Sequence, residues 1–578
     1  MRIVMAQINP TVGDLDGNAQ RVIECIEEGQ RTSADLVVFP ELVMSGYPPE
    51  DLLLKDHFPT DCSHALDVVA GACLDTVALV GYPQRGEDGH VYNAAAVVAR
   101  GRIMDVYRKI LLPNHPVFDE QWYFAPGNEV LILQMPQARI AVSIGEDIWY
   151  RNGSSEEVTL GAVAAPQAQV VVNLSMSPYH HRKGHEREEM LRRRARGAGA
   201  YLVYVNGVGG QDELVFDGHS VAVDPTGELL CRAPQFKEAL LLVNVDISRV
   251  TPKEPDADEA VRVTEVSPGS HVPNCMGQGF CGDLQACIAD VTETLSDEGE
   301  IYEALCLGTA DYVNKNGFER VVIGLSGGID CALVTCIAVD ALGKDRVVGV
   351  TMPSRYSTAA TRSDAELLAN HLDIEFREIS IESVFVAYLD ALADTFVGRD
   401  VDVTEENIQA RIRGNYLMAL SNKFGWLVLT NGNKSETAVG YTTLYGDMAG
   451  GFAVIKDVPK TMVYRLSRYR NERGPGQGPI PQSTIDRPPS AELRAGQTDQ
   501  DGLPPYDLLD RIVEAYVVRD ESVEEIAAAG LDRALVERIV RMIDLNEYKR
   551  RQAAPGVRIT PKAFGKDRRL PITNRYHR

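Results

Sequence analysis

Short apolar runs rich in valine, isoleucine and leucine alternate with helical or polar stretches over residues 1 to 250. The runs are DLVVFPE, VALVGYP, IAVSIGED, QVVVNLS, YLVYVNG and ALLLVNVD. Runs that are this short and this continuously apolar predict strands buried on both faces of a sheet. We therefore expect residues 1 to 250 to form an α/β or sandwich domain.

The alternation of short apolar runs with helical or polar stretches stops over residues 251 to 295. There, TPKEPDADEA and SPGSHVPNCMGQGF are typical of a linker. EIYEALCLGTADYVNKNGF then shows helical periodicity, and VVIGLSGGID predicts a strand, a glycine turn and a new helix. Residues 296 to 578 are therefore expected to form a second α/β domain. Within it, residues 470 to 501 are dense in proline and glycine and predict a long mobile segment, either a lid or a surface loop.

Length and composition support two domains in a soluble protein. With 578 residues, the chain exceeds what one hydrophobic core usually organises. It contains 44% hydrophobic and 24% charged residues, and no apolar stretch is long enough to span a membrane. The N-terminus MRIVMAQINP lacks the apolar core of a secretory signal, so we expect a cytoplasmic protein without a membrane partner.

Charge and cysteine usage argue against a nucleic-acid-binding protein and against a disulfide-rich protein. A formal charge of −24 would repel a nucleic-acid backbone, so we expect no nucleic-acid partner. The ten cysteines show no metal-ligand spacing, and we expect reduced thiols rather than a disulfide framework.

The segment GLSGGIDC directly follows an apolar strand and carries the strongest chemical signal. Its residues are Gly324, Leu325, Ser326, Gly327, Gly328, Ile329, Asp330 and Cys331. Glycines let the backbone approach an anion closely, and the N–H groups of a following helix can hold pyrophosphate. A carboxylate beside phosphates implies a bridging magnesium ion.

This segment resembles the pyrophosphate loop of the N-type ATP pyrophosphatases. Among these, LVLTNGNKSETAVGYTTLYGDMAGGFAVIKDVPKT, PPSAELRAGQTDQDGLPPYDLLD and EYKRRQAAPGVRITPKAFGKDRRLPITNRY look like the glutamine-type NAD synthetases. The resemblance implies a C-terminal doubly wound parallel sheet. It also implies that a carboxylate of deamido-NAD attacks ATP to form an adenylate, and that ammonia then displaces AMP. The protein's main task in such a step is to position two anionic substrates.

By this resemblance, the site residues of the synthetase divide into three groups. The ATP site would comprise residues 324 to 331 with Asn431 and Lys460, the deamido-NAD site Asn407, Glu436 and Lys549, and the magnesium site Asp330 and Glu436. Cys331 stands where serine is usual, and Asn431 where threonine is usual. A thiol donates a weaker hydrogen bond than a hydroxyl, so we expect weaker ATP affinity at most.

The first domain resembles the nitrilase superfamily, which implies an αββα sandwich with a catalytic glutamate, lysine and cysteine. FPELVMSGYPPEDLL supplies Glu41, and YRKILLPNHPVFDEQWYFAPG supplies Lys109 with Glu120 close behind. The cysteine position, in IAVSIGEDIW, is Gly145. Since the thiolate is the attacking group in this chemistry, we expect an inactive amidase whose Glu41 and Lys109 remain as a buried ion pair.

The residues expected to contact glutamine are mixed. Ser177 and Lys183 in NLSMSPYHHRK fit the family, whereas His115 stands where tyrosine is usual. The synthetase would then take free ammonia, and the amidase domain would serve assembly in the large homo-oligomer that the resemblance implies.

Three other interpretations stay open. The chain could use glutamine through an unrecognised nucleophile, or be a non-catalytic regulatory paralogue. It could also be another ligase with the same loop, such as one that makes GMP or asparagine, although these lack the NKSE and PPSAEL segments.

Overall fold

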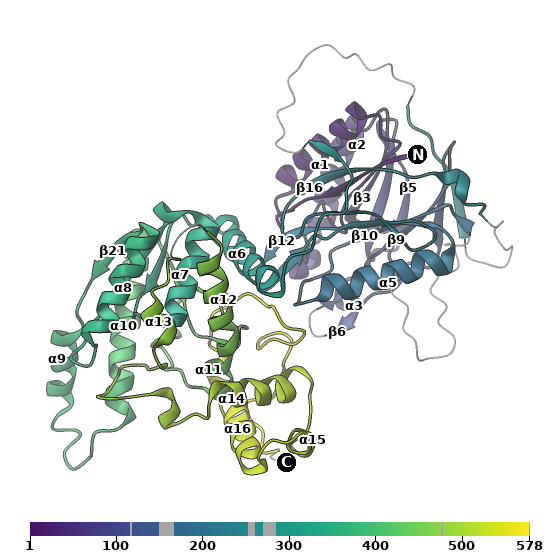
Figure 1. Cartoon of the computed structure of the whole chain (residues 1–578). Coiled ribbons are helices and arrows are strands. Elements are labelled where there is room, and N and C mark those ends of the chain that lie inside the picture. Colours follow the sequence, from purple (N-terminus) through teal and green to yellow (C-terminus); the bar gives the residue numbers. More distant parts are fainter. Residues whose placement is uncertain (116–117, 149–166, 253–260, 270–284, 475–477, 577–578) are drawn as a thin grey trace. The chain divides into compact units, whose positions relative to one another are not determined.

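The structure is a computed structural model that describes residues 1–115, 118–148, 167–252, 261–269, 285–474 and 478–576. The chain forms two compact units (Figure 1). The first comprises Met1–Gln211 and Val215–Leu295, and the second comprises Asp212–Leu214 and Ser296–Arg578. In the part of the chain that is described, no helix is both long and apolar enough to cross a membrane.

Two seven-stranded sheets form the middle of the first unit. The first sheet has the order β18 (Ala286–Ile288), β16 (Ala239–Asn244), β1 (Arg2–Gln7), β2 (Leu36–Val38), β3 (Val77–Arg85), β4 (Val91–Ala99) and β5 (Arg102–Arg108). The second has the order β15 (Leu229–Arg232), β14 (Val221–Val223), β11 (Tyr201–Asn206), β10 (Val170–Ser175), β9 (Arg139–Ile144), β8 (Val130–Gln134) and β17 (Val261–Glu265).

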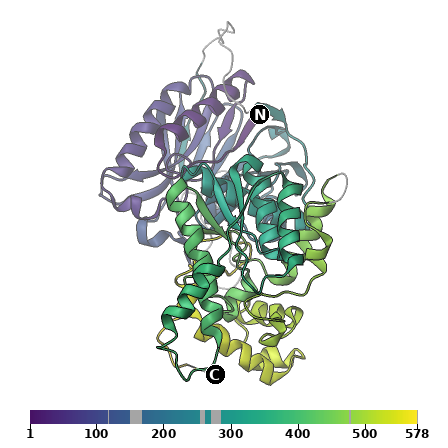
Figure 2. The same cartoon turned by 90° about the vertical axis from the view of Figure 1, so that its left-hand side faces the viewer.

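Alternation along the strands separates the layers of this unit. Ile3 and Met5 of β1 join the core between the two sheets, whereas Val4 and Ala6 face helices α1 (Leu15–Arg31) and α2 (Phe58–Ala72). The helix α5 (Lys183–Ala198) covers the outer face of the second sheet. Figure 2 shows the purple helices α1 and α2 over one face of the first unit. The expected αββα sandwich is confirmed.

The segment expected as a linker contributes to this sandwich. Within residues 251 to 295, β17 pairs in parallel with β8, and β18 pairs in parallel with β16. Both are edge strands. The linker expectation is therefore wrong for these residues, because edge strands need only one neighbour and carry a weaker apolar pattern.

The second unit is built on a five-stranded parallel sheet. Its order is β21 (Glu375–Glu378), β20 (Val347–Thr351), β19 (Val321–Gly324), β22 (Leu427–Thr430) and β23 (Phe452–Ala453). Helices α6 (Asp297–Lys315), α7 (Ile329–Leu342) and α12 (Lys460–Glu472) lie side by side (Figure 1). The expected doubly wound sheet is confirmed, and its strand order switches beside β19, where such folds bind ligands.

The remaining helices flank or extend this sheet. They are α8 (Ala359–Leu372), α9 (Glu382–Leu392), α10 (Val403–Phe424), α11 (Lys434–Val439), α13 (Gln482–Asp486), α14 (Tyr506–Val513), α15 (Val523–Ala528), α16 (Arg533–Leu545) and α17 (Glu547–Arg550). A cluster of buried apolar side chains packs α11, α14, α15 and α16 together.

The proline- and glycine-rich segment at 470 to 501 is packed in its described part. It contains α13, and Ile480, Thr484, Ile485 and Asp499 are buried. The expectation of an unpacked segment is therefore wrong here, because a few apolar side chains between the prolines anchor it.

Candidate functional site

A cavity of about 450 Å³ opens at the carboxyl ends of β19, β20 and β22 in the second unit. It is lined by every residue that the sequence predicts for ATP and deamido-NAD: Gly324, Leu325, Ser326, Gly327, Gly328, Ile329, Asp330, Cys331, Asn407, Asn431, Glu436, Lys460 and Lys549. These residues come from separate segments of the chain, and the fold brings them to one place.

The glycine turn between β19 and α7 is shaped by close contact with its neighbour α8. Gly327 has a φ of +80°, and a Cβ there would lie 2.2 Å from the carbonyl oxygen of Thr361. Only glycine fits this position. Gly328 caps α7, so the first N–H groups of that helix border the cavity and provide donors for an anion.

Lys460 joins two acidic residues at the cavity wall. Its Nζ lies 2.5 Å from Oδ2 of Asp330 and 3.1 Å from Oε1 of Glu436. Asn433 donates from Nδ2 to the other oxygen of Asp330 at 2.9 Å. Burial alone would lower the pKa of Lys460, but the two carboxylates raise it, so the ammonium stays charged.

The two carboxylates suit a magnesium ion that arrives with a nucleotide. Their oxygens converge on one ammonium and are hard donors of the kind that Mg²⁺ prefers. Among the described residues, no group of three His, Cys, Asp or Glu side chains forms a metal site by itself. Asp330 and Glu436 would therefore share the ion with phosphate oxygens.

The residues expected to face deamido-NAD are anchored on the other side of the cavity. Asn407 Oδ1 accepts a hydrogen bond from Thr443 Oγ1 at 2.8 Å. Lys549 Nζ donates to the carbonyl oxygens of Gly440 and Thr442 at 2.7 and 2.8 Å, and burial lowers its pKa. Both side chains are thus held in place by neighbouring polar groups.

The structure adds residues that sequence reasoning missed. Arg413 on α10 lines the cavity, donates from Nε to the carbonyl of Met352 at 3.0 Å, and has its pKa lowered to about 10 by burial. Asp499 also lines it, and accepts a hydrogen bond from Tyr506 at 2.7 Å. Arg413 lies outside the segments that carry the family resemblance, whereas Asp499 lies in one of them, PPSAELRAGQTDQDGLPPYDLLD, and could have been found there.

Part of the proline-rich segment forms one wall of this cavity. Arg487 donates to the carbonyl oxygen of Gly327 at 3.1 Å and forms an ion pair with Asp364 on α8. Glu492 accepts from the hydroxyl of Thr361 at 2.9 Å. The segment is therefore tied to both the glycine turn and α8.

A second polar site lies at the strand ends of the first unit, around Gly145. Lys109 Nζ donates to Oε1 of Glu41 at 2.7 Å, and both residues are 2% exposed. A Cβ on Gly145 would lie 2.9 Å from Oε2 of Glu41 and 2.9 Å from Nζ of Lys109. The structure thus places Gly145 between the two charged groups, and the expected buried ion pair is confirmed.

Glu120 completes this buried charge cluster. Its Oε2 lies 2.8 Å from Lys109 Nζ, and its Oε1 accepts from the hydroxyl of Tyr47 at 2.8 Å. Burial raises the pKa of Glu120 against the opposing effect of Lys109. Although burial alone would lower the pKa of Lys109, the two carboxylates raise it, so the lysine is charged.

The backbone around Gly145 is held by Asp147, which sequence reasoning missed. Asp147 accepts hydrogen bonds from the N–H groups of Leu111 at 2.7 Å and Ile144 at 3.1 Å, and from the hydroxyl of Tyr107 at 2.7 Å. Burial raises its pKa to about 6. The turn therefore keeps a defined shape although Gly145 has no side chain.

The residues expected to contact glutamine have different surroundings. Ser177 follows β10, and Lys183 begins α5. His115 belongs to the short strand β6 (Asn114–His115), but its side chain lies outside the described part of the structure.

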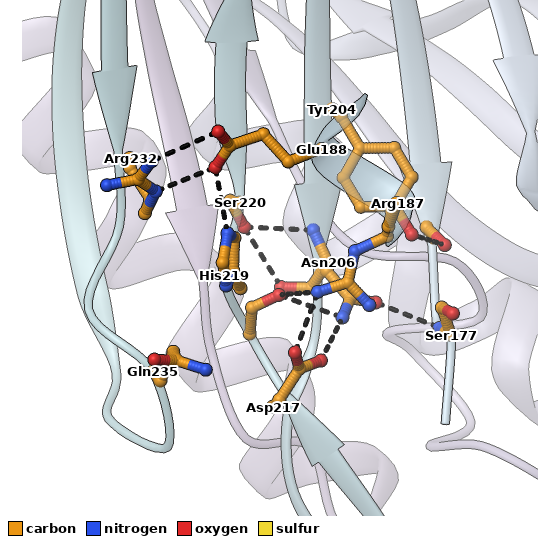
Figure 3. Close-up of polar contacts among 12 residues, drawn as sticks. Ser177, Arg187, Glu188, Tyr204, Asn206, Asp217, His219, Ser220, Arg232 and Gln235 are labelled. Carbon is orange, nitrogen blue, oxygen red and sulfur yellow. Dashed lines mark hydrogen bonds and ion pairs between the residues drawn. The ribbon is translucent and has the colours of Figure 1, made fainter. Parts of the chain in front are cut away.

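Ser177 is held by a buried polar network (Figure 3). Its N–H donates to Asn206 Oδ1 at 2.9 Å, and Asn206 Nδ2 donates to Asp217 Oδ1 at 3.2 Å. Arg187 on α5 forms an ion pair with Asp217 at 2.8 Å. Arg187, Asn206 and Asp217 are each 0% exposed, so the network fixes the second sheet against α5 in the interior.

Comparison with known proteins identifies a family for each half of the chain. A family model described as NAD synthase matches residues 301–553, and one described as carbon-nitrogen hydrolase matches residues 2–254. The glutamine-dependent NAD(+) synthetase of Thermotoga maritima is 48% identical over 586 residues, covering 100% of this chain and 99% of that protein. The enzyme of the same name from Aquifex aeolicus is 46% identical and covers 100% of both chains.

A solved structure supports the same relationship. The glutamine-dependent NAD+ synthetase of Acinetobacter baumannii, in complex with adenosine diphosphate, has a TM-score of 0.74 and 39% identity. The match covers 99% of this chain and 98% of that one. With the identities and coverage of these relatives, the chain belongs to the glutamine-dependent NAD+ synthetase family.

Proposed function

We propose that this enzyme forms NAD from deamido-NAD and MgATP, and that it takes its nitrogen from free ammonia. The observation that carries the first part is the single cavity lined by all residues expected for ATP and deamido-NAD. The glycine turn, a buried lysine and two carboxylates are the groups that binding and activating a nucleotide triphosphate require.

The reaction follows from the chemistry of a carboxylate, which is a poor acylating agent. An oxygen of the nicotinate carboxylate attacks the α-phosphorus of ATP, and the bond to the bridging oxygen breaks to release pyrophosphate. Ammonia then attacks the acyl carbon of the adenylate, loses a proton, and AMP leaves. The N–H groups of the glycine turn and Lys460 are placed to stabilise the charge on the departing phosphates.

The nitrogen source is inferred from Gly145. What supports it is that Gly145 lies beside Glu41 and Lys109, the two groups between which we expect a nucleophilic side chain in an active amidase. Among the described cysteines of the first unit, Cys287 is exposed on the edge strand β18, and burial raises the pKa of Cys25, Cys62, Cys73 and Cys231 to about 12. The four buried thiols are protonated at neutral pH and are poor nucleophiles.

The test is NAD formation by the purified full chain with deamido-NAD and MgATP, supplied with either ammonium chloride or ammonia-free glutamine. We expect NAD and AMP with ammonium only. Equal rates with glutamine would contradict the use of free ammonia. No product with either source would contradict the synthetase and favour a regulatory paralogue.

A gain-of-function variant sharpens this test. Gly145→Cys places a thiol between flexible ends of Glu41 and Lys109, which can shift to admit it, and we expect glutamine hydrolysis to appear. Gly145→Ala is the matched control, because it adds a Cβ at the same left-handed φ of +47° without a thiol. Hydrolysis by neither variant would show that more than the nucleophile is missing.

A further inference from the structure

Arg413 is a basic residue of the synthetase cavity whose hydrogen-bond donors are only partly satisfied. Its Nε donates to the carbonyl oxygen of Met352 at 3.0 Å, and both residues line the cavity. With the described residues, the two Nη groups of Arg413 form no hydrogen bond and no ion pair. The edge of the guanidinium that carries one N–H from each Nη is therefore unsatisfied, and such an edge fits two oxygens of one anion.

The other basic side chains that line this cavity already have partners. These are Arg362 with Glu378, Lys460 with Asp330 and Glu436, Arg487 with Asp364, and Lys549 with two carbonyl oxygens. Arg413 differs from them, because the carboxylate whose charge acts on it, Glu492, forms no ion pair with it. Glu492 instead accepts a hydrogen bond from Thr361 at 2.9 Å.

The charge of Arg413 is held in the protein at a cost. Burial lowers the pKa of its guanidinium to about 10, and the charge of Glu492 offsets this only in part. A guanidinium with this pKa is still charged at neutral pH. Because a buried cation without a paired anion costs free energy, an anionic ligand in the cavity would recover that cost.

The surroundings of Arg413 indicate which part of a nucleotide it meets. Met352 directly follows β20, and a Cβ on Gly324 would lie 3.3 Å from Cε of Met352 and 3.4 Å from Cδ1 of Leu417. Met352 and Leu417 thus form an apolar patch at the start of the glycine turn, which suits the base of a nucleotide. Leu417 lies one helical turn after Arg413 on α10, so Arg413 is next to this patch.

The other end of the glycine turn suits the terminal phosphates. Gly328 precedes the first N–H groups of α7, and Lys460 pairs with Asp330 in the first turn of that helix. The phosphate that is bonded to the nucleoside would lie between these donors and the apolar patch, beside Arg413. This α-phosphate is also the group that the nicotinate carboxylate attacks, so a cation there reduces the repulsion between two anions.

We propose that Arg413 binds the α-phosphate of ATP through both Nη groups and stays on the same phosphate in the adenylate and in AMP. The assignment rests on the proposed synthesis of NAD from deamido-NAD and ATP, and it adds a phosphate-binding residue to that site. No bond to Arg413 forms or breaks in the reaction. The guanidinium neutralises the phosphate oxygens while the carboxylate attacks the phosphorus and pyrophosphate leaves.

Binding of AMP and of adenosine tests this assignment without turnover, since the two ligands differ only by the phosphate. In calorimetric titrations of the full chain, we expect Arg413→Met to bind AMP roughly 10- to 100-fold more weakly than the wild type, with adenosine affinity changed by less than about twofold. Equal losses for both ligands, or an unchanged affinity for AMP, would overturn the proposal. A wild-type chain that binds neither ATP nor AMP would contradict the proposed function itself, and this assignment with it.

Two further variants separate the phosphate contact from general effects of losing an arginine. Arg411→Met is the matched control and should bind AMP like the wild type. Arg411 also donates from Nε to a backbone carbonyl, that of Leu444 at 3.2 Å, but it is exposed and is not among the described residues that line the cavity. Arg413→Lys keeps the charge without the paired N–H groups and should restore part of the AMP affinity. Weaker binding of deamido-NAD by Arg413→Met, with AMP binding retained, would assign Arg413 to the nicotinate carboxylate and overturn the proposal.

Discussion

The ammonium of Lys460 lies 2.5 Å from the carboxylate of Asp330, and this ion pair joins residues that are 130 positions apart. Lys460 begins α12, whereas Asp330 lies in the first turn of α7 beside the glycine turn. A second contact of Lys460 with Glu436 brings α11 into the same cluster. One lysine thus positions both acidic groups that are proposed to share magnesium with ATP.

We predict that Lys460→Met lowers NAD formation roughly 100- to 1,000-fold, because a buried cation that stabilises charge on the phosphates is lost. The loss should be the same at saturating ammonium. Steady-state rates with deamido-NAD and MgATP measure it. Lys423→Met is the control, because Lys423 is exposed at the end of α10. Equal rates for the two variants would contradict a role of Lys460 in the reaction.

The ionisation of Glu436 predicts a pH dependence of nucleotide binding. Burial raises the pKa of Glu436 to about 7, and Lys460 offsets this only in part. The group is therefore mostly neutral below this pH and ionised above it. If Glu436 holds magnesium as proposed, only its ionised form can do so, and we expect the Kd for MgATP to fall as the pH rises from about 6 to about 8.

Equilibrium binding of MgATP across this range checks the prediction without requiring turnover. The Glu436→Gln variant should show weak binding and little change over the same range. A wild-type Kd that stays constant with pH would separate Glu436 from the metal.

Cys331 offers a test of the unusual thiol in the glycine turn. Its Sγ lies 3.4 Å from the hydroxyl of Ser326 and 3.1 Å from the carbonyl of Gly328. We expect Cys331→Ser to lower the KM for ATP by about two- to fivefold with little change in kcat, because a hydroxyl is the stronger donor. Cys287→Ser, at an exposed thiol, is the control. Kinetics like those of the wild type would leave this interpretation without support.

Local patterns allowed part of the site to be predicted from the sequence. The run from the strand β19 into the glycine turn and α7 is continuous in the chain, so GLSGGID marks it directly. Asn93 could also have been singled out from the sequence, because it is an amide within the otherwise largely apolar strand VYNAAAVVA. Its meaning becomes clear only when the fold brings Glu41 beside it.

Other features depend on packing between distant segments and could not be predicted. Arg413 reaches the cavity because α10 packs against β19 and β22. The proline-rich segment looked unpacked by composition, yet Arg487 ties it to Gly327 and Asp364. The proline and glycine content of such a segment predicts its turns, but it does not predict the few side-chain contacts that hold the segment against the rest of the domain.

The buried pair of Arg187 and Asp217 gives the sharpest prediction for stability (Figure 3). Arg187→Met should destabilise the first unit by about 3–5 kcal/mol, because Asp217 would keep a buried charge without its partner. Urea unfolding measures this as a lower midpoint. Arg193→Met on the same helix is the control, since the side chain of Arg193 is 67% exposed.

The double variant Arg187→Met with Asp217→Asn separates charge from packing. Removing both charges eliminates the stranded carboxylate, so we expect the double variant to recover much of the stability lost by Arg187→Met alone. A double variant that is less stable than the single one would instead assign the loss to packing of Arg187 against Tyr204, over whose ring it lies at 5.5 Å. Stabilities that add independently would show that the ion pair contributes nothing beyond its separate side chains.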